Sequence, residues 1–304
     1  MNVLNLALTV GVTYLLLLGA SLGSMTYLLP YLPFLLIAFS FPHFLATYWI
    51  WIKRIKSVKD EIWPLLFPLI YIGLFIYGPI PISIIVKLSY SYLIYHFSQQ
   101  LYGVALWSTS KGLTLARWEK HFLRTYFLVN GFYALLDFER RGVAKVLFYY
   151  ETPSLEIPAS LIIGTFSLSL ILLALILGRI GYLFLKTSQK SLFVLIAFVG
   201  LSLVWFVPPF SYEMVLFLPI IHALQFLPLA RLKLSKVSKV EWISGVFSCL
   251  ILGWFFFRFL PHMEFRYFSH GIWPVLVLTL LNNHHFIIEG RIWKLRDPQN
   301  SDLS

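Results

Sequence analysis

The chain has 304 residues, of which 59% are hydrophobic and only 12% are charged, and its mean hydropathy is +0.79. A water-soluble fold of this size could not bury so many apolar side chains in one core. On this composition we exclude a water-soluble fold and predict an all-α integral membrane protein, a polytopic bundle of transmembrane helices.

The formal net charge of +11 does not predict a nucleic-acid partner, because most Lys and Arg residues lie in short loops between hydrophobic runs. We expect anionic membrane lipid to be the partner of this charge. A single cysteine, Cys249, excludes a disulfide framework and any zinc or iron–sulfur site made of cysteines. Any metal must then be held by His, Asp or Glu.

Ten apolar runs follow one another along the chain, and a run of about 17–25 residues can cross the hydrocarbon core as a helix. They leave no room for a separate soluble domain. We therefore expect residues 1–304 to form one membrane domain with a short cytoplasmic tail at 294–304. The runs lie at 3–22, 27–52, 62–78, 80–107, 121–137, 159–184, 192–208, 210–230, 242–260 and 269–293.

Positive charge alternates between the loops. Sixteen of the 24 Lys and Arg residues lie in loops that follow even-numbered runs, whereas five lie in or beside loops that follow odd-numbered runs. Basic residues are retained on the cytoplasmic side of a membrane. This predicts a multi-pass protein of the cell membrane, with both termini in the cytoplasm and each even-numbered helix running from outside to inside.

Histidines recur inside four of the even-numbered runs. His43, His96, His222 and the pair His284–His285 lie in the second, fourth, eighth and tenth runs. They precede the polar cytoplasmic ends of these runs by seven to twelve residues, which the helical rise converts to a depth of about 10–18 Å. The remaining histidines lie near the ends of runs, where we expect interfacial positions: His121, His262 and His270.

Imidazoles gathered at one depth predict a shared metal site, because neutral histidines bind iron, zinc and copper. The expected ligands are His43, His96, His222 and one or both of His284 and His285. A ligating imidazole needs an acceptor at its second nitrogen, and Gln or Glu one helical turn away can supply it. The expected residues of this supporting layer are Gln99, Gln100, Gln225 and Glu289.

The order of these motifs resembles the Brp/Blh family of membrane-bound β-carotene 15,15′-dioxygenases. The resemblance extends from about residue 40 to 293, and each motif has only two or three residues. The matching elements are Pro42-His43, His96-Phe97, Pro208-Pro209 followed by His222, and His284 followed by Glu289.

The resemblance implies a non-haem iron that activates dioxygen and cleaves the central double bond of a carotenoid to give retinal. Its ligands would be His43, His96, His222 and His284. The chain departs from the family where Phe226 replaces a second histidine of the third motif, and where the acid near His96 is missing. The ending at residues 282–293 is more elaborate than the family's and resembles the signature of a sister group.

We therefore expect a metal-dependent membrane oxygenase, with Fe(II) or else zinc or copper, that acts on a lipophilic isoprenoid or carotenoid-like substrate. No catalytic side chain and no oligomeric state are assigned. The alternatives are a membrane redox protein with haem b held by paired histidines, and a transporter with a path lined by His and Gln. A di-iron desaturase or hydroxylase is less favoured, because the sequence has one His-His pair rather than repeated histidine boxes.

Overall fold

The computed structural model describes residues 31, 38, 40–54, 61–78, 81–110, 115–142, 152–153, 155–187, 219–220, 222–223, 237–260, 263 and 272–292. The long elements among these residues are seven α-helices and one π-helix, and no strand occurs there, which confirms the all-α prediction for this part of the chain. The elements are α3 (Phe41–Arg54), α4 (Ile62–Tyr77), α5 (Ile82–Ser110), α6 (Arg117–Arg141), α8 (Ala159–Thr187), α11 (Lys239–Trp254), η7 (Phe255–Phe259) and α12 (Ile272–Ile292).

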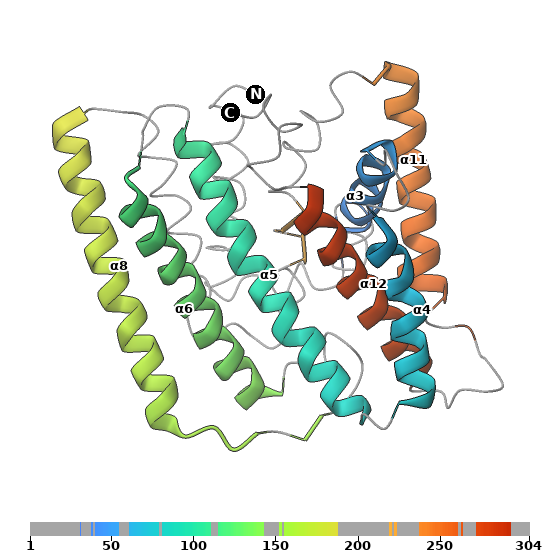
Figure 1. Cartoon of the computed structure of the whole chain (residues 1–304), viewed down its shortest axis with the longest axis horizontal. Helices are drawn as coiled ribbons and strands as arrows, with labels where there is room; N and C mark the ends of the chain where they lie inside the picture. Colours follow the sequence, from blue (N-terminus) through green and yellow to red (C-terminus); the bar gives the residue numbers. More distant parts are fainter. Residues whose placement is uncertain are drawn as a thin grey trace.

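The helices stand side by side as a slab (Figure 1). Helix α5 packs against α6, α6 packs against α8, and α12 contacts α3, α4 and α5, while α11 packs on α3. Helices α4, α5, α6 and α8 run in alternating directions through this slab (Figure 1). Helix α12 is therefore the element on which three other helices converge.

Seven of the ten apolar runs overlap with described helices. The runs at 3–22 and 192–208, most of the run at 210–230, and the tail at 294–304 lie outside the described residues. Within the described part, one helix is long and apolar enough to cross a membrane, the stretch Ala159–Leu183 of α8. The number of ten spans thus stays a prediction.

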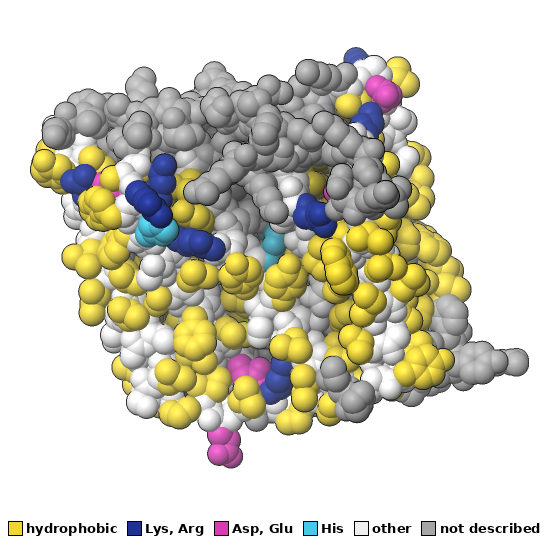
Figure 2. All heavy atoms as spheres, in the orientation of Figure 1, with side chains coloured by type: hydrophobic (Ala, Val, Ile, Leu, Met, Phe, Trp, Pro, Cys, Tyr) yellow, Lys and Arg dark blue, Asp and Glu magenta, His cyan; other side chains and the backbone are white. Residues whose placement is uncertain are grey.

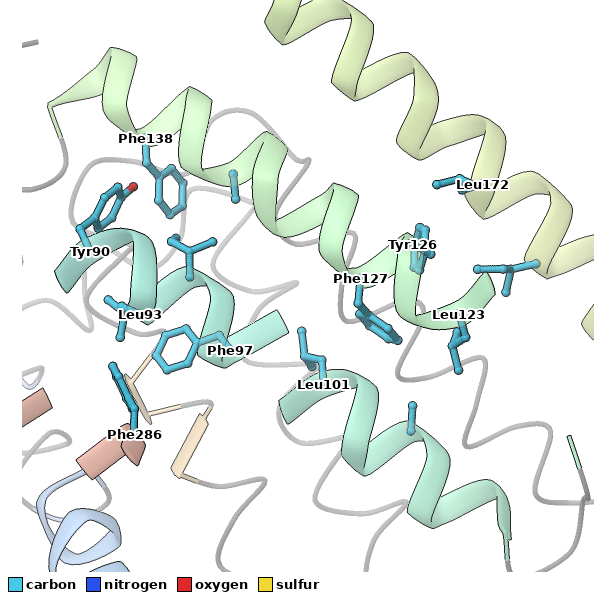
Figure 3. Close-up of a cluster of buried hydrophobic side chains, with 14 of the residues drawn as sticks. Tyr90, Leu93, Phe97, Leu101, Leu123, Tyr126, Phe127, Phe138, Leu172 and Phe286 are labelled. Atoms are coloured by element: carbon cyan, nitrogen blue, oxygen red, sulfur yellow. The ribbon is translucent and has the colours of Figure 1, made fainter. Parts of the chain in front are cut away.

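Aromatic and aliphatic side chains fill the space between α5, α6, α8 and α12 (Figure 3). Tyr90 and Phe97 from α5, Tyr126 and Phe127 from α6, and Phe286 from α12 are all buried in this cluster. Because large rings interlock at native packing density, they fix how α5 lies against its neighbours. This core therefore sets the position of the histidine that α5 carries.

Large apolar side chains also cover much of the outer surface (Figure 2). On α4 the exposed fractions of Trp63 and Leu69 are 71% and 67%, and on α11 that of Phe247 is 63%. Helix α8 exposes Ile163 and Ile171 in the same way. Contiguous apolar surface of this kind marks contact with an apolar environment or with a partner.

The start of α11 is fixed by a reciprocal cap. The Ser238 hydroxyl accepts a hydrogen bond from the Glu241 backbone N–H at 3.2 Å, and the Glu241 carboxylate accepts one from the Ser238 backbone N–H at 3.0 Å. Hydrogen bonding to Ser238, together with the nearby Lys53 ammonium, lowers the pKa of the Glu241 carboxyl from its usual value. Lys53 lies at the end of α3, 3.7 Å from Glu241, so the cap joins these two helices at the same level.

Helices α3 and α11 approach closely at a glycine. A Cβ atom built on Gly245 would lie 2.4 Å from two ring atoms of Trp49, closer than any side chain tolerates. Gly245 therefore makes room for the indole ring that α3 places against α11. This contact holds the helix that carries His43.

We predict that Gly245→Ala lowers the thermal unfolding midpoint of the purified protein, because Trp49 must move and overpacking typically costs about 1–3 kcal/mol. Gly178→Ala is the matched control, since no atom lies within 4 Å of a Cβ there. That change should be neutral or slightly stabilising. Equal midpoints for the two variants would contradict this account of the α3–α11 contact.

Candidate metal centre

The first histidine is placed by the start of α3. Pro42 is the second residue of α3 and directly precedes His43. The His43 side chain that follows is completely buried. One turn later the Thr47 hydroxyl donates a hydrogen bond to the His43 carbonyl at 3.1 Å, which satisfies this polar group locally.

Helix α5 contributes His96 to the site and also contacts the backbone of His222. His96 lies in the middle of this helix, with Gln100 one turn further along the same face. The Gln100 side chain donates from Nε2 to the backbone carbonyl of His222, at 3.4 Å. Gln100, predicted to support an imidazole, thus contacts the backbone of a site residue.

Helix α12 brings the last imidazole and a carboxylate. His285 and Glu289 are four residues apart and therefore share one face, and both are buried. Because α12 contacts α3 and α5, this face is directed at the histidines that those helices carry. Four segments of the chain thus meet at one point.

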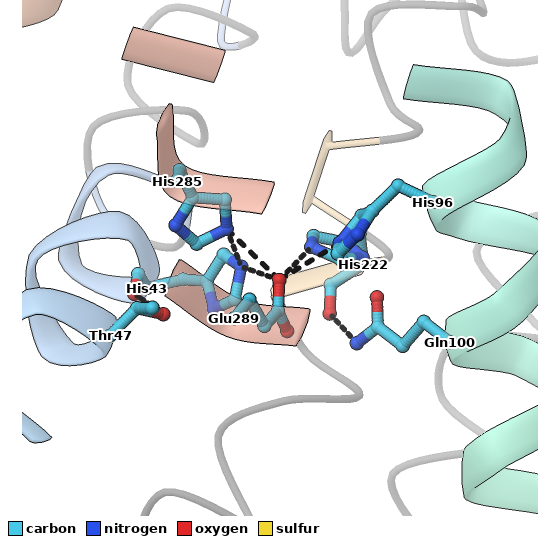
Figure 4. Close-up of polar contacts among 7 residues, drawn as sticks. All are labelled: His43, Thr47, His96, Gln100, His222, His285 and Glu289. Carbon is cyan, nitrogen blue, oxygen red and sulfur yellow. Dashed lines mark hydrogen bonds and ion pairs between the residues drawn. The ribbon is translucent and has the colours of Figure 1, made fainter. Parts of the chain in front are cut away.

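Glu289 Oε2 lies at the centre of the cluster (Figure 4). It is 2.8 Å from His96 Nε2, 3.1 Å from His285 Nε2, 3.5 Å from His222 Nε2 and 4.0 Å from His43 Nε2. The Nε2 atoms of His285 and His43 are themselves 3.1 Å apart. We call these five residues the His/Glu cluster.

The donor atoms of the cluster suit a metal ion. His43, His222, His285 and Glu289 each offer one ligand atom, and these four atoms lie within 4.8 Å of one another. With bonds of about 2.1 Å, ligands on opposite sides of an ion are about 4.2 Å apart, so a small contraction would complete coordination. Imidazole nitrogen with carboxylate oxygen is a donor set that both iron and zinc accept.

Unsatisfied atoms support the same interpretation. His96 Nε2, His222 Nε2 and Glu289 Oε2 are buried, and apart from their contacts with the other atoms of the cluster they have no hydrogen-bond partner within the described part of the chain. Where neutral imidazoles direct lone pairs at the carboxylate, these atoms repel one another and are costly to bury. A cation among them would remove this cost, so the cluster could hold a metal ion.

Phenylalanine rings pack around the imidazoles. Phe44 stacks on His285 with the ring centres 4.0 Å apart, and Phe286 stacks on His96 at 4.1 Å. Phe97 lies 4.6 Å from the His222 ring. Each ring belongs to the residue directly after a cluster histidine. Four His-Phe dipeptides occur in the sequence, and three of them contribute to this layer: His43-Phe44, His96-Phe97 and His285-Phe286. The fourth, His121-Phe122, lies on α6 outside the cluster, so the dipeptide was a partial sequence signal for this layer.

His284 lies outside the His/Glu cluster, in contrast to the ligand set that the family resemblance implied. Pro68 lacks an N–H, so the Pro64 carbonyl one turn earlier in α4 has no partner inside the helix. His284 Nε2 donates to this carbonyl at 2.9 Å, and in a neutral imidazole Nδ1 then accepts the Tyr48 hydroxyl, 2.7 Å away. Both ring nitrogens are thereby occupied, and His285 is the member of the pair that faces the cluster.

The remaining predicted supporting residues have different positions. Gln99 Oε1 accepts a hydrogen bond from Arg124 Nε of α6 at 3.2 Å, so its carbonyl end is directed to α6. Gln225 lies outside the described residues. Glu289 was predicted to support an imidazole through its second nitrogen, yet its carboxylate lies among the Nε2 atoms, where a ligand would lie.

Comparison with models of known families, with curated proteins and with solved structures finds no match to this chain.

We predict that His285→Ala and His284→Ala separate metal binding from stability. Metal binding worth about 10–16 kcal/mol for four ligands implies about 3 kcal/mol for each, so His285→Ala should weaken metal retention about 100-fold. His284→Ala should retain metal but unfold at a lower temperature, because the Pro64 carbonyl loses its partner. The readouts are elemental analysis and thermal unfolding of detergent-purified protein.

The same loss of metal is expected for His43→Ala and His222→Ala, whereas His96→Ala should weaken metal retention less, because His96 contacts the Glu289 carboxylate. His121→Ala, at an exposed position of α6, is the control. Metal contents that are equal in His284→Ala and His285→Ala would show that the cluster is not the metal site.

Proposed function

We propose that the chain is a multi-pass membrane protein of about ten spans with cytoplasmic termini. The uneven distribution of Lys and Arg between alternate loops supports this proposal. The apolar outer faces of α4, α8 and α11 support it as well, because lipid would cover them. Alternating helix directions agree with a chain that crosses the membrane repeatedly (Figure 1).

We further propose that the His/Glu cluster binds Fe(II) and that the protein is a metal-dependent oxygenase. The single observation that carries this proposal is the convergence of four imidazoles and one carboxylate from four segments on a buried point. His43, His222, His285 and Glu289 would hold the ion, with His96 beside the carboxylate. Such an iron supplies the ability to bind and activate dioxygen, which histidine and carboxylate ligands with open positions support.

The substrate we propose is a lipophilic isoprenoid, and the cavity beside the cluster suits it. A cavity of about 290 Å³ is lined by apolar residues of α3, α4, η7 and α12, among them Leu45, Phe256 and Leu281. Phe44 forms part of its wall and stacks on His285, so one ring separates the cavity from the cluster. Tyr48 and His284 also line the cavity but hydrogen-bond to each other, which suits a hydrocarbon ligand.

The resemblance to Brp/Blh enzymes suggests the reaction, oxidative cleavage of a carbon–carbon double bond in a carotenoid-like chain. In such a reaction the double bond breaks and each carbon receives one oxygen atom of dioxygen, so two carbonyl products form and no external reductant is needed. The protein's contribution is to hold the alkene in a dry, apolar site and to keep water away from the buried cluster.

Haem b is a less suitable occupant of the cluster. A porphyrin would have to enter between two histidines, whereas here four imidazoles and a carboxylate approach one another directly. The ring centre of His43 lies 4.6 Å from that of His222 and 4.7 Å from that of His285, which leaves no space for a flat macrocycle. A single ion is the occupant that this spacing favours.

The proposal is tested by expression in a bacterial host that makes β-carotene. We expect oxygen-dependent loss of the carotenoid, or of another isoprenoid, with carbonyl products that chromatography and mass spectrometry detect. His43→Ala in the same host and the wild-type chain without oxygen are the controls. Pigment and isoprenoid profiles that stay unchanged while the purified protein contains iron would reject the oxygenase.

We also predict that Leu281→Trp reduces substrate consumption at least tenfold while metal content stays at the wild-type value, because the indole would fill the cavity. Leu170→Trp on α8 is the matched control, since that side chain lies on the outer surface. Full activity of Leu281→Trp would mean that the substrate lies elsewhere.

A further inference from the structure

A second cavity lies between α6 and α8, away from the His/Glu cluster. Its volume is about 320 Å³, and its walls are largely apolar, with Phe122 and Leu123 on α6 and Ile176 and Ile180 on α8. This groove opens to the surface and has no part in the proposed oxygenase site.

One cation lies at the groove and has hydrogen-bonding capacity to spare. Arg179 donates from Nε to Glu119 Oε1 at 2.6 Å, and its side chain remains 39% exposed. No hydrogen bond is recorded for its terminal nitrogens within the described residues. A guanidinium presents five N–H groups, so this end could bind a phosphate while the Glu119 contact remains.

Other cations lie at the same end of α6 but on a different face of the helix. Arg117, Lys120 and Arg124 are exposed in its first turns, and Arg124 Nε donates to Gln99 of α5, away from the groove-lining Trp118 and Phe122. These cations raise the electrostatic potential at this end of the helices, which favours an anion there. Among the residues that line the groove, the cation that can contact an anion directly is Arg179.

The level of the groove also fits a lipid headgroup. Arg179 lies four residues, or about 6 Å, before the end of the apolar stretch Ala159–Leu183. Trp118 and Tyr182 lie beside it, with their ring centres 5.6 Å and 5.0 Å from its guanidinium carbon. Aromatic rings with Arg at the end of an apolar helix are typical of the membrane interface.

We propose that this groove binds one anionic glycerophospholipid. Its acyl chain would lie along Phe122, Ile176 and Ile180, and its phosphate would contact the terminal nitrogens of Arg179. This inference rests on the proposed membrane location, but not on the proposed metal or oxygenase chemistry. The cytoplasmic leaflet, where the loop charges place this end of α8, is also the leaflet rich in anionic lipid.

The test is native mass spectrometry of the detergent-purified full chain with phosphatidylglycerol or phosphatidylcholine as the added lipid. We expect one phosphatidylglycerol to be retained about tenfold more tightly than phosphatidylcholine, and Arg179→Gln to remove this preference. Arg140→Gln, at the opposite end of α6, is the charge-matched control. Equal retention of the two lipids, or an unchanged preference in Arg179→Gln, would overturn the proposal.

Two further variants guard against effects of misfolding. Glu119→Gln should strengthen phosphatidylglycerol binding several-fold, because it removes the negative charge beside Arg179, and a damaged fold would not produce that gain. Ile176→Trp should block the groove for both lipids, whereas Ile171→Trp, exposed on α8, should not. Weaker or unchanged binding in Glu119→Gln would contradict the role of Arg179.

Metal content is measured in the same preparations, which separates this proposal from the oxygenase. Lipid selectivity without bound metal would support the lipid site and reject the metal centre. Bound metal without lipid selectivity would do the reverse.

Discussion

The burial of one carboxylate among four imidazoles is the constraint on which the rest of this structure depends. Glu289 and the histidines around it are removed from water, where each polar atom must find a partner or destabilise the fold. No single helix can supply those partners. The chain meets the requirement by bringing α3, α5, α12 and the segment around His222 to one point, and Gln100 and Thr47 hold the backbone of two of these segments.

The adjacent residues His284 and His285 show how helical geometry divides two tasks. Successive residues of a helix are about 100° apart, so the two rings leave α12 in different directions. His285 joins the buried cluster, whereas His284 donates to the carbonyl that Pro68 leaves without a partner in α4. A polar residue inside an apolar helix can thus serve the backbone of a neighbour rather than a ligand.

The helices differ in mean hydropathy because some of them carry polar residues into the interior and others do not. Helix α8 contributes no residue to the cluster and exposes much of its apolar surface, and it alone among the described helices is long and apolar enough to span a membrane. Helices α5 and α12 carry His, Asn, Gln and Glu toward the interior, which lowers their mean hydropathy. The polar content of a helix here reflects the side chains that it carries into the interior.

The sequence by itself determined the helical class and the recurrence of histidines at similar distances from the ends of their apolar runs, because composition and spacing are local properties. It also identified His43, His96 and His222 as members of one group. Only the tertiary structure decided that His285 rather than His284 faces the group, and that Glu289 lies among the Nε2 atoms. Those outcomes depend on the rotation of α12 against three neighbouring helices and on a carbonyl that a proline in α4 leaves free. Because these contacts join residues far apart in the chain, the spacing of residues along the sequence cannot predict them.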